Sequence, residues 1–192
     1  MTYKYKVVRV EMDDADYRSF IKSLSSGFRS RYIIRQSWMY AIIKLGIPKK
    51  ANVVIPEFQS CEFNYIKCRC DSAKFIKVEK FFLKTLSNVT YFSTTGDDVY
   101  YYDITNYIKK KYNIKNFDYS SLYNHFFPYF FGKYVKPYKK IDLNPHKECG
   151  SGIHFVSSLT DAENFLKINI FKNYYNNVQE GETDGIFSED GN

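Results

Sequence analysis

The chain has 192 residues, which is enough for one large domain with a substantial core, and its 44% apolar content excludes a disordered chain. Basic residues outnumber acidic residues by 28 to 21, which gives a net charge of +7. Because no apolar run approaches the roughly 18 residues of a membrane span, and the N-terminus lacks the apolar stretch of a secretory signal, we expect an intracellular protein without a membrane partner.

The first elements alternate between strand and helix patterns. Residues 3–12 alternate in polarity and predict a strand. An acidic turn then leads into a short helix predicted at 17–24, which the sequence Ser-Ser-Gly ends. A strand-like piece with basic neighbours follows at 32–34.

A buried helix is predicted over residues 36–45. Trp38, Ile42 and Leu45 recur at helical spacing and would share one face. Gly46 follows at the position where a helix commonly ends, so the pattern also predicts the boundary.

Short β patterns dominate the next part of the chain. The sequence Thr-Thr-Gly-Asp-Asp predicts the loop of a hairpin between strands at 89–93 and 99–102. A helical turn or two is predicted just before this hairpin, at 79–86. The strands predicted before it are 53–55, 58–65 and 74–78.

Two helices that begin with an aspartate cap are predicted next. The first spans 103–112 and the second spans 118–127, where Pro128 ends it. An extended basic segment is predicted at 134–141.

Residues 147–166 predict a turn, a short buried strand and a capped helix. Gly150 and Gly152 supply the torsional freedom of a close approach, and Ile153–Val156 form the strand. Ser158 is a suitable N-cap, and Asp161 approximates a capping box. The apolar stripe of this helix consists of Leu159, Ala162, Phe165 and Leu166.

These elements together predict a single α+β domain over residues 1–179, with a mainly antiparallel sheet and several packed helices. We expect Ile153–Val156 to be an inner strand that is covered by the helix starting near Ser158. Phe155 and Phe165 should then be buried.

Residues 180–192 form an acidic C-terminal tail without lysine or arginine. The first 179 residues therefore hold 28 basic and 16 acidic side chains. A basic body with an acidic tail predicts attraction to a polyanion, or a tail that lies on the body or contacts another copy in a homodimer. A solvated surface that maintains solubility is the alternative. The tail is expected to contribute nothing to the core.

Two stretches carry a resemblance to a known module. The first is 67–79, and the second runs from 133–137 (Lys-Tyr-Val-Lys-Pro) to 148–155 (Glu-Cys-Gly-Ser-Gly-Ile-His-Phe), ending at 162–165. They resemble an uncharacterised module of large DNA viruses and phages that is often found beside pentapeptide repeats. The chain has no such repeat, and a long insertion separates the two stretches. The resemblance implies a viral protein located in the host cytoplasm or the virion, and it implies no activity.

The sequence from Gly150 to Phe155 is also similar to the Gly-x-Gly-Ile-Tyr-Phe strand of ADP-ribosyltransferases, with His154 in the place of the tyrosine. Ser93 resembles the strand serine of that family, and Glu182 resembles its catalytic glutamate. This similarity implies His154, Ser93 and Glu182 as catalytic candidates. However, Ser93 and Glu182 are further apart than in that family, and a packed strand histidine is the alternative for His154.

The cysteines are the candidate metal ligands, namely Cys61, Cys68, Cys70 and Cys149. Cys68 and Cys70 would point to the same face of a strand, and no second close cysteine pair exists. Buried, reduced thiols are the alternative, so we expect neither a metal nor another cofactor.

Basic clusters with interleaved tyrosines are the candidate nucleic-acid interface, because lysine and arginine neutralise phosphates while tyrosines stack on unpaired bases. The solvated face of an amphipathic helix is the alternative for the middle cluster. The candidates are Arg29, Arg31, Arg35, Lys109, Lys110, Lys111, Lys136, Lys139 and Lys140.

Three functions remain open from the sequence. The leading expectation is a non-enzymatic module that contacts an unknown viral or host protein, because a packed aromatic-rich domain is evident and a complete active site is not. Sequence-independent nucleic-acid binding is the alternative. ADP-ribosyltransferase-like nucleotide chemistry is the third possibility.

Overall fold

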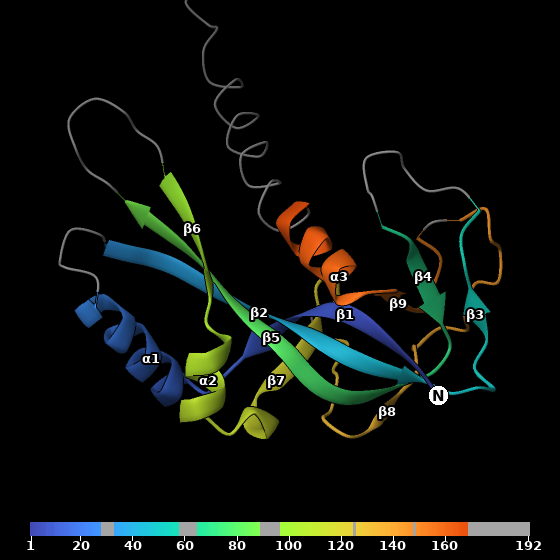
Figure 1. The fold of residues 1–192 in the computed structure, drawn as a ribbon, viewed down its shortest axis with the longest axis horizontal. Helices are drawn as coiled ribbons and strands as arrows, with labels where there is room; N and C mark the ends of the chain where they lie inside the picture. Colours follow the sequence, from blue (N-terminus) through green and yellow to red (C-terminus); the bar gives the residue numbers. More distant parts are fainter. Residues whose placement is uncertain (28–32, 58–64, 89–96, 125, 148, 169–192) are drawn as a thin grey trace, which may run out of the picture.

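A computed structural model describes the chain except for residues 28–32, 58–64, 89–96, 125, 148 and 169–192. In the described part, nine strands form one antiparallel sheet with three α-helices and a short 3-10 helix (Figure 1). The strands are β1 (Thr2–Glu11), β2 (Ile33–Ile47), β3 (Val53–Val54), β4 (Lys67–Cys70), β5 (Ala73–Asn88), β6 (Asp97–Asp103), β7 (Asp118–Ser121), β8 (Tyr134–Val135) and β9 (Ile153–Val156). The helices are α1 (Asp14–Gly27), α2 (Thr105–Lys111), η1 (Ile114–Asn116) and α3 (Leu159–Leu166). The predicted single α+β domain with a mainly antiparallel sheet is confirmed.

The sheet forks along one edge of β1. Its strand order is β3-β4-β9-β1-β2-β5-β6, and β7 also pairs with β1 while β8 pairs with β5. Because β2 occupies one edge of β1, β7 and β9 share the other. Tyr5 pairs with Val156 of β9, whereas residues 8–11 pair with β7. β7 and β9 therefore diverge beside Lys6 and Val7.

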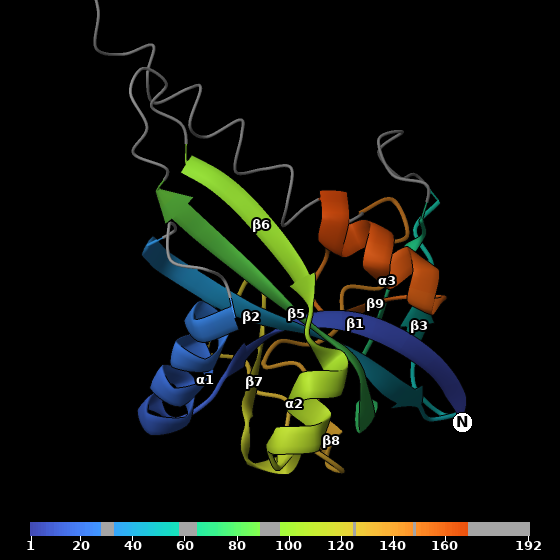
Figure 2. The ribbon, with the colours of Figure 1, turned by 60° about the vertical axis from the view of Figure 1, so that its left-hand side comes forward.

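The sheet separates two apolar clusters, because successive side chains of a strand point to opposite faces. Val8 and Val10 of β1 belong to the larger cluster, together with Phe20 of α1 and Ile108 of α2. Val7 belongs to the second cluster, together with the apolar face of α3. Figures 1 and 2 accordingly show α1 and α2 on one side of the sheet and α3 on the other.

The strand–cap–helix unit at 153–166 is confirmed. β9 lies between β4 and β1, so it is an inner strand. The Oγ of Ser158 accepts a hydrogen bond of 3.0 Å from the backbone N–H of Asp161, and the Asp161 carboxylate accepts one of 3.0 Å from the backbone N–H of Ser158. Phe155 and Phe165 are only 3% and 8% exposed.

Replacing Ser158 with alanine is expected to lower the free energy of unfolding by about 1 kcal/mol, because the first turn of α3 loses the acceptor for one of its free N–H groups. Urea unfolding followed by circular dichroism measures the change. Thr160→Ala, at an exposed position of the same helix, is the control and should be neutral or slightly stabilising. Equal losses in both variants would show that the capping box does not stabilise α3.

The helix predicted over 36–45 is wrong, because this segment lies within β2. Ala41 and Ile43 pack in the larger cluster and Ile42 packs in the second, so the strand is apolar on both faces. Such a strand shows no alternation of polarity and cannot be distinguished from a buried helix by spacing alone. The helical turn predicted at 79–86 is wrong as well, since these residues belong to β5.

The helix predicted over 118–127 is also wrong. β7 takes the first four of these residues, and the chain then turns back so that Ser120 forms a bridge with Pro128. Tyr119 is buried, and its neighbours Asp118 and Ser120 are exposed or half-buried. Pairing with β1 and burial of Tyr119 therefore outweigh the tendency of Asp118 to start a helix.

Other predicted elements are confirmed or lie outside the described residues. The predicted strand at 58–65, apart from its last residue, the predicted strand at 89–93 and the tail at 180–192 lie outside them. No helix in the described part is both long enough and apolar enough to cross a membrane. The helix predicted at 17–24 is confirmed within α1, although Ser-Ser-Gly still belongs to the helix. The helix predicted at 103–112 is confirmed as α2, but its aspartate cap is wrong, because Asp103 ends β6 and Ile104 is the N-cap. The confirmed strands are those at 3–12, 53–55, 74–78, 99–102 and 153–156.

Candidate functional site

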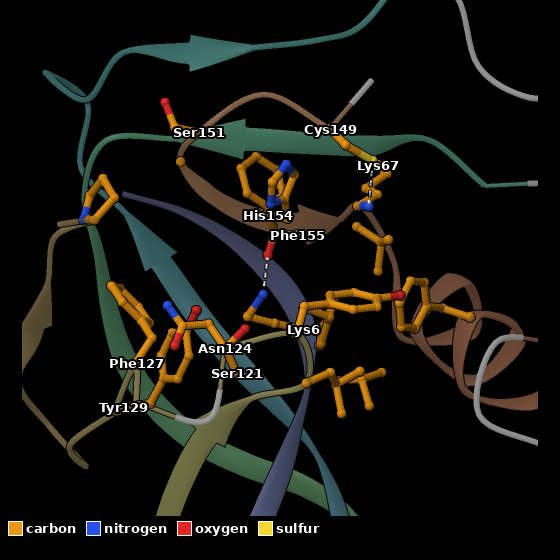
Figure 3. Close-up of a pocket in the computed structure, with 18 of the residues that line it drawn as sticks. Lys6, Lys67, Ser121, Asn124, Phe127, Tyr129, Cys149, Ser151, His154 and Phe155 are labelled. Carbon is orange, nitrogen blue, oxygen red and sulfur yellow. Dashed lines mark hydrogen bonds between the residues drawn. The ribbon is translucent and has the colours of Figure 1, made fainter. Parts of the chain in front are cut away.

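A pocket of about 740 Å³ lies where β7 and β9 diverge from β1 (Figure 3). We call it the fork pocket. Its described lining comes from β1, β4, β9, α3 and the segments 121–129, 137–139 and 149–152. Phe127 from the larger cluster and Phe165 from the second cluster both line it. The pocket thus reaches residues on both faces of the sheet, because the fork leaves the edge of β1 uncovered.

Lys6 projects from β1 into the fork pocket. It continues the row of Val8 and Val10, since every second residue of a strand faces the same side. Its Nζ donates a hydrogen bond of 2.9 Å to the carbonyl oxygen of His154, which Figure 3 shows as a dashed line across the pocket. The same Nζ lies 5.6 Å from the centre of the Tyr129 ring. The fork thus places an amine where the rest of the row is apolar.

Lys67 brings a second cation to the pocket from β4. Its Nζ lies 3.3 Å from the Sγ of Cys149 and 5.6 Å from the centre of the Tyr123 ring. Burial, followed by the nearby Lys67 ammonium, lowers the pKa of Lys6 to about 8. Lys6 therefore holds a neutral fraction near neutral pH that an ordinary lysine lacks.

An aromatic wall closes one side of the pocket. The Phe127 ring packs edge-on against Tyr129 and Tyr138, with ring centres 5.3 Å and 5.1 Å apart. The hydroxyl of Tyr138 donates a hydrogen bond of 2.7 Å to the carbonyl oxygen of Phe126, which fixes this wall to the preceding loop. Tyr129 is buried at the inner end, where burial raises its pKa, and Tyr138 is exposed at the outer end.

The charge of the pocket has one sign. Lys6, Lys67 and Lys139 are the charged residues among its described lining residues, which include no aspartate or glutamate. Within the part of the chain that the structure describes, none of the three forms an ion pair with a carboxylate. A concave surface that is lined by cations and by no described anion attracts an anionic ligand. The aromatic wall adds contact area for a planar group.

The surroundings of His154 favour its neutral imidazole form. Burial, followed by the charges of Lys6, Lys67 and Arg69, lowers its pKa to about 3, and a hydrogen bond with the backbone of Gly150 only partly opposes them. Its Nε2 is buried and has no hydrogen-bond partner among the described residues. His154 lies on β9 as predicted and lines the fork pocket.

A buried arginine holds the loop beside the pocket. Arg69 of β4 is 0% exposed and donates to three backbone carbonyls. The distances are 2.8 Å to Asp142, 2.5 Å to Asn144 and 2.6 Å to Lys147. The guanidinium therefore fixes the segment that leads into the pocket residues 149–152.

Two glycines allow this approach, as predicted. A Cβ on Gly150 would lie 2.9 Å from the Cβ of Asp142 and 3.1 Å from the Cζ of Arg69. Gly152 has a φ of 146°, and a Cβ there would lie 3.2 Å from the Cβ of Arg69. The glycines that precede β9 thus make room for Arg69.

The structure brings together few of the residues predicted from the sequence. Of the three catalytic candidates, His154 lines the fork pocket, whereas Ser93 and Glu182 lie outside the described residues.

Lys6 and Lys67 were missed. The available signal for Lys6 was its place in a row of inward-facing valines, which exposed lysines do not share.

The candidate metal ligands are placed separately. Cys68 and Cys70 are buried in β4, where burial raises both thiol pKa values, that of Cys70 to about 12. Cys149 is an exposed free thiol, and Cys61 lies outside the described residues. No group of three or more metal-binding side chains occurs in the described ranges.

The basic clusters lie on different elements. Lys109, Lys110 and Lys111 are exposed on α2, which packs on β5. The three basic residues of the third cluster, Lys136, Lys139 and Lys140, are exposed after β8, and Lys139 lines the fork pocket. Arg29 and Arg31 lie outside the described residues, and the backbone of Arg35 belongs to β2 while its side chain is not described.

Comparisons with models of protein families, with curated proteins and with solved structures found no match to this chain. The resemblance to a viral module therefore stays a prediction, and the function must be argued from the site.

Proposed function

We propose that the protein binds single-stranded nucleic acid without sequence preference, and that the fork pocket receives one nucleotide of the strand. The observation that carries this proposal is a pocket lined by three lysines, by no carboxylate in its described lining, and by an aromatic wall. A nucleotide unit combines an anionic phosphate with a planar base, which matches both properties.

The two halves of the unit would use different parts of the pocket. Lys67 and Lys139 supply cations to phosphate oxygens, since neither has a carboxylate partner in the described part. The rings of Phe127 and Tyr138 supply apolar surface to the base. Stacking on an aromatic side chain contributes about 1 to 3 kcal/mol per base and does not depend on base identity.

Fluorescence anisotropy with labelled single-stranded and double-stranded oligonucleotides, titrated at several salt concentrations, tests the proposal. We expect micromolar affinity for single strands that falls steeply with salt and exceeds the affinity for duplexes. Lys139→Ala should weaken binding and reduce the slope of log affinity against log salt by about 0.7, because one phosphate contact is lost.

Lys110→Ala is the matched control, because Lys110 is also an exposed lysine but lies on α2 away from the pocket lining. It should leave the slope nearly unchanged. If both variants lose the same affinity, binding is a general effect of net charge. If salt has no effect on the wild-type affinity, the proposal is wrong.

Protein contact is the second candidate function, favoured by the exposed aromatic side chains beside the pocket. Tyr123, Phe126 and Phe130 are 70%, 88% and 59% exposed. Grouped exposed apolar side chains are typical of interaction sites. Sedimentation velocity over a wide range of concentrations would detect self-association, and Phe126→Ser should abolish it if this loop is the interface.

A further inference from the structure

The fork pocket contains an amine that the proposed nucleotide contacts do not use. Lys6 reaches the pocket from a row of core valines, and its only hydrogen-bond acceptor among the described residues is the carbonyl oxygen of His154. No described carboxylate pairs with it, and Lys67 is the nearby cation. A half-buried lysine beside a second cation is an arrangement that turns an amine into a nucleophile.

We propose that Lys6 forms a Schiff base with an aldehyde that carries a phosphate group, held in the fork pocket by Lys67 and Lys139. The lone pair of the neutral Nζ attacks the carbonyl carbon and forms the C–N bond of a carbinolamine. The carbonyl oxygen takes up the two protons that Nζ loses and leaves as water, and a neutral imine between Lys6 and the former aldehyde carbon remains. No electron is gained or lost, so the step needs no oxidant or reductant.

The class of aldehyde follows from the other pocket residues. Lys67 and Lys139 would bind the phosphate group. The described residues that line the pocket include no carboxylate that would repel it. Two sources supply this chemistry, namely a free aldehyde phosphate and an abasic nucleotide within a strand, whose open-chain sugar carries an aldehyde between phosphates. The second source rests on the nucleic-acid binding proposed above, and the first does not.

The pH dependence of the reaction follows from the groups that face Lys6. They are Lys67 and Cys70 of β4, His154 of β9 and Tyr129 of the opposite wall, and the other titratable residues that line the same pocket are Tyr5, Tyr123, Tyr138, Lys139 and Cys149. His154 and Tyr129 stay neutral near pH 7 because burial lowers the pKa of the first and raises that of the second. With the pKa of Lys6 at about 8, its reactivity should rise up to this pH and then level off.

Labelling of the full chain tests the proposal. Pyridoxal 5′-phosphate is one probe, and a single-stranded oligonucleotide with one abasic site is the other. Each is incubated with the protein, the imine is fixed with sodium borohydride, and the modified lysine is identified by peptide mass spectrometry. At pH 7 we expect Lys6 to be labelled roughly tenfold or more faster than exposed Lys110, because a larger fraction of Lys6 is neutral.

A second variant separates phosphate recognition from amine reactivity. Lys67→Ala should slow labelling of Lys6 by pyridoxal 5′-phosphate more than labelling by propanal, which has no phosphate. Labelling of Lys6 at the rate of Lys110, or equal effects of Lys67→Ala on both aldehydes, would overturn the proposal. Labelling by the abasic strand in addition to the free aldehyde would assign the strand as a source, and labelling by the free aldehyde alone would assign the small molecule.

The same samples distinguish this inference from the proposed function. Affinity for an intact oligonucleotide does not require imine formation, so intact binding with an unreactive Lys6 would reject the Schiff base alone. A reactive Lys6 without any binding of intact strands would reject nucleic-acid binding alone.

Discussion

Replacing Arg69 with methionine is expected to lower the free energy of unfolding by about 3 to 5 kcal/mol, because three hydrogen bonds from a fully buried guanidinium are lost, each hydrogen bond of a charged group contributes about 1.5 to 3 kcal/mol, and water replaces only part of them. Methionine retains much of the side-chain volume, so the loss reports the hydrogen bonds to Asp142, Asn144 and Lys147. Chemical denaturation with a linear extrapolation measures the change.

Two control variants test whether the loss of stability comes from the hydrogen bonds of Arg69 rather than from its charge. Lys140→Met removes one positive charge from an exposed position and should change stability by less than about 0.5 kcal/mol. Arg69→Lys keeps the charge but should still be clearly destabilising, because a single ammonium cannot reproduce the planar donors of a guanidinium. A fully stable Arg69→Met protein would show that the 142–147 segment does not depend on Arg69.

Phe75→Ala is expected to cost about 3 to 5 kcal/mol, as do other truncations of fully buried aromatic residues. Phe75 of β5 is 0% exposed, and its ring centre lies 5.1 Å from those of both Tyr119 and Phe131. Its backbone also pairs with Gly132 and Lys133. Denaturant unfolding should show a lower midpoint with an unchanged slope.

Phe126→Ala is the matched control, since it removes the same ring from a position that is 88% exposed. It should leave the midpoint nearly unchanged. Phe75 contacts Tyr119 and Phe131, which flank Phe127 and Tyr129 of the aromatic wall, so Phe75→Ala should also weaken binding at the fork pocket under conditions where the protein remains folded. Equal stability of the two variants would contradict the packing described for Phe75.

The sequence was sufficient to predict the structure where hydrogen bonds between neighbouring residues determine it. Ser158 and Asp161 satisfy backbone groups within their own turn, so the start of α3 is encoded in four consecutive residues. Gly150 and Gly152 were predicted to allow a close approach, but the group that approaches, Arg69, lies about 80 positions earlier and could not be inferred.

The long strand β2 could not be predicted because its central part is buried on both faces. Ile42 and Ile43 are both 0% exposed, one in each apolar cluster, so hydrophobic periodicity carries no strand signal there. Tertiary pairing with β1 and β5 decides the conformation of β2. β5 differs, because Phe81 and Leu83 are buried whereas Lys80 and Phe82 are half-buried, so an alternating strand signal was present at 79–86 and was missed.

The fork pocket depends on strand pairing rather than on any local motif. Lys6, Lys67 and Lys139 belong to distant parts of the chain, and only the divergence of β7 from β9 brings them together. Basic clusters in the sequence gave prominence to Lys109, Lys110 and Lys111, whereas Lys6 and Lys67 lie outside the clusters that were singled out. The position of Lys6 in a row of core valines was therefore a better guide to the pocket than a run of lysines.

Photo-crosslinking tests the central claim most directly. A single-stranded oligonucleotide containing 5-bromouridine is bound to the protein at low salt, irradiated and digested, and the modified peptides are identified by mass spectrometry. If the fork pocket receives a nucleotide, adducts should form on its tyrosines, foremost Tyr138 and Tyr123, and high salt should abolish them. Adducts confined to α2, or binding without any adduct near the pocket, would contradict this account.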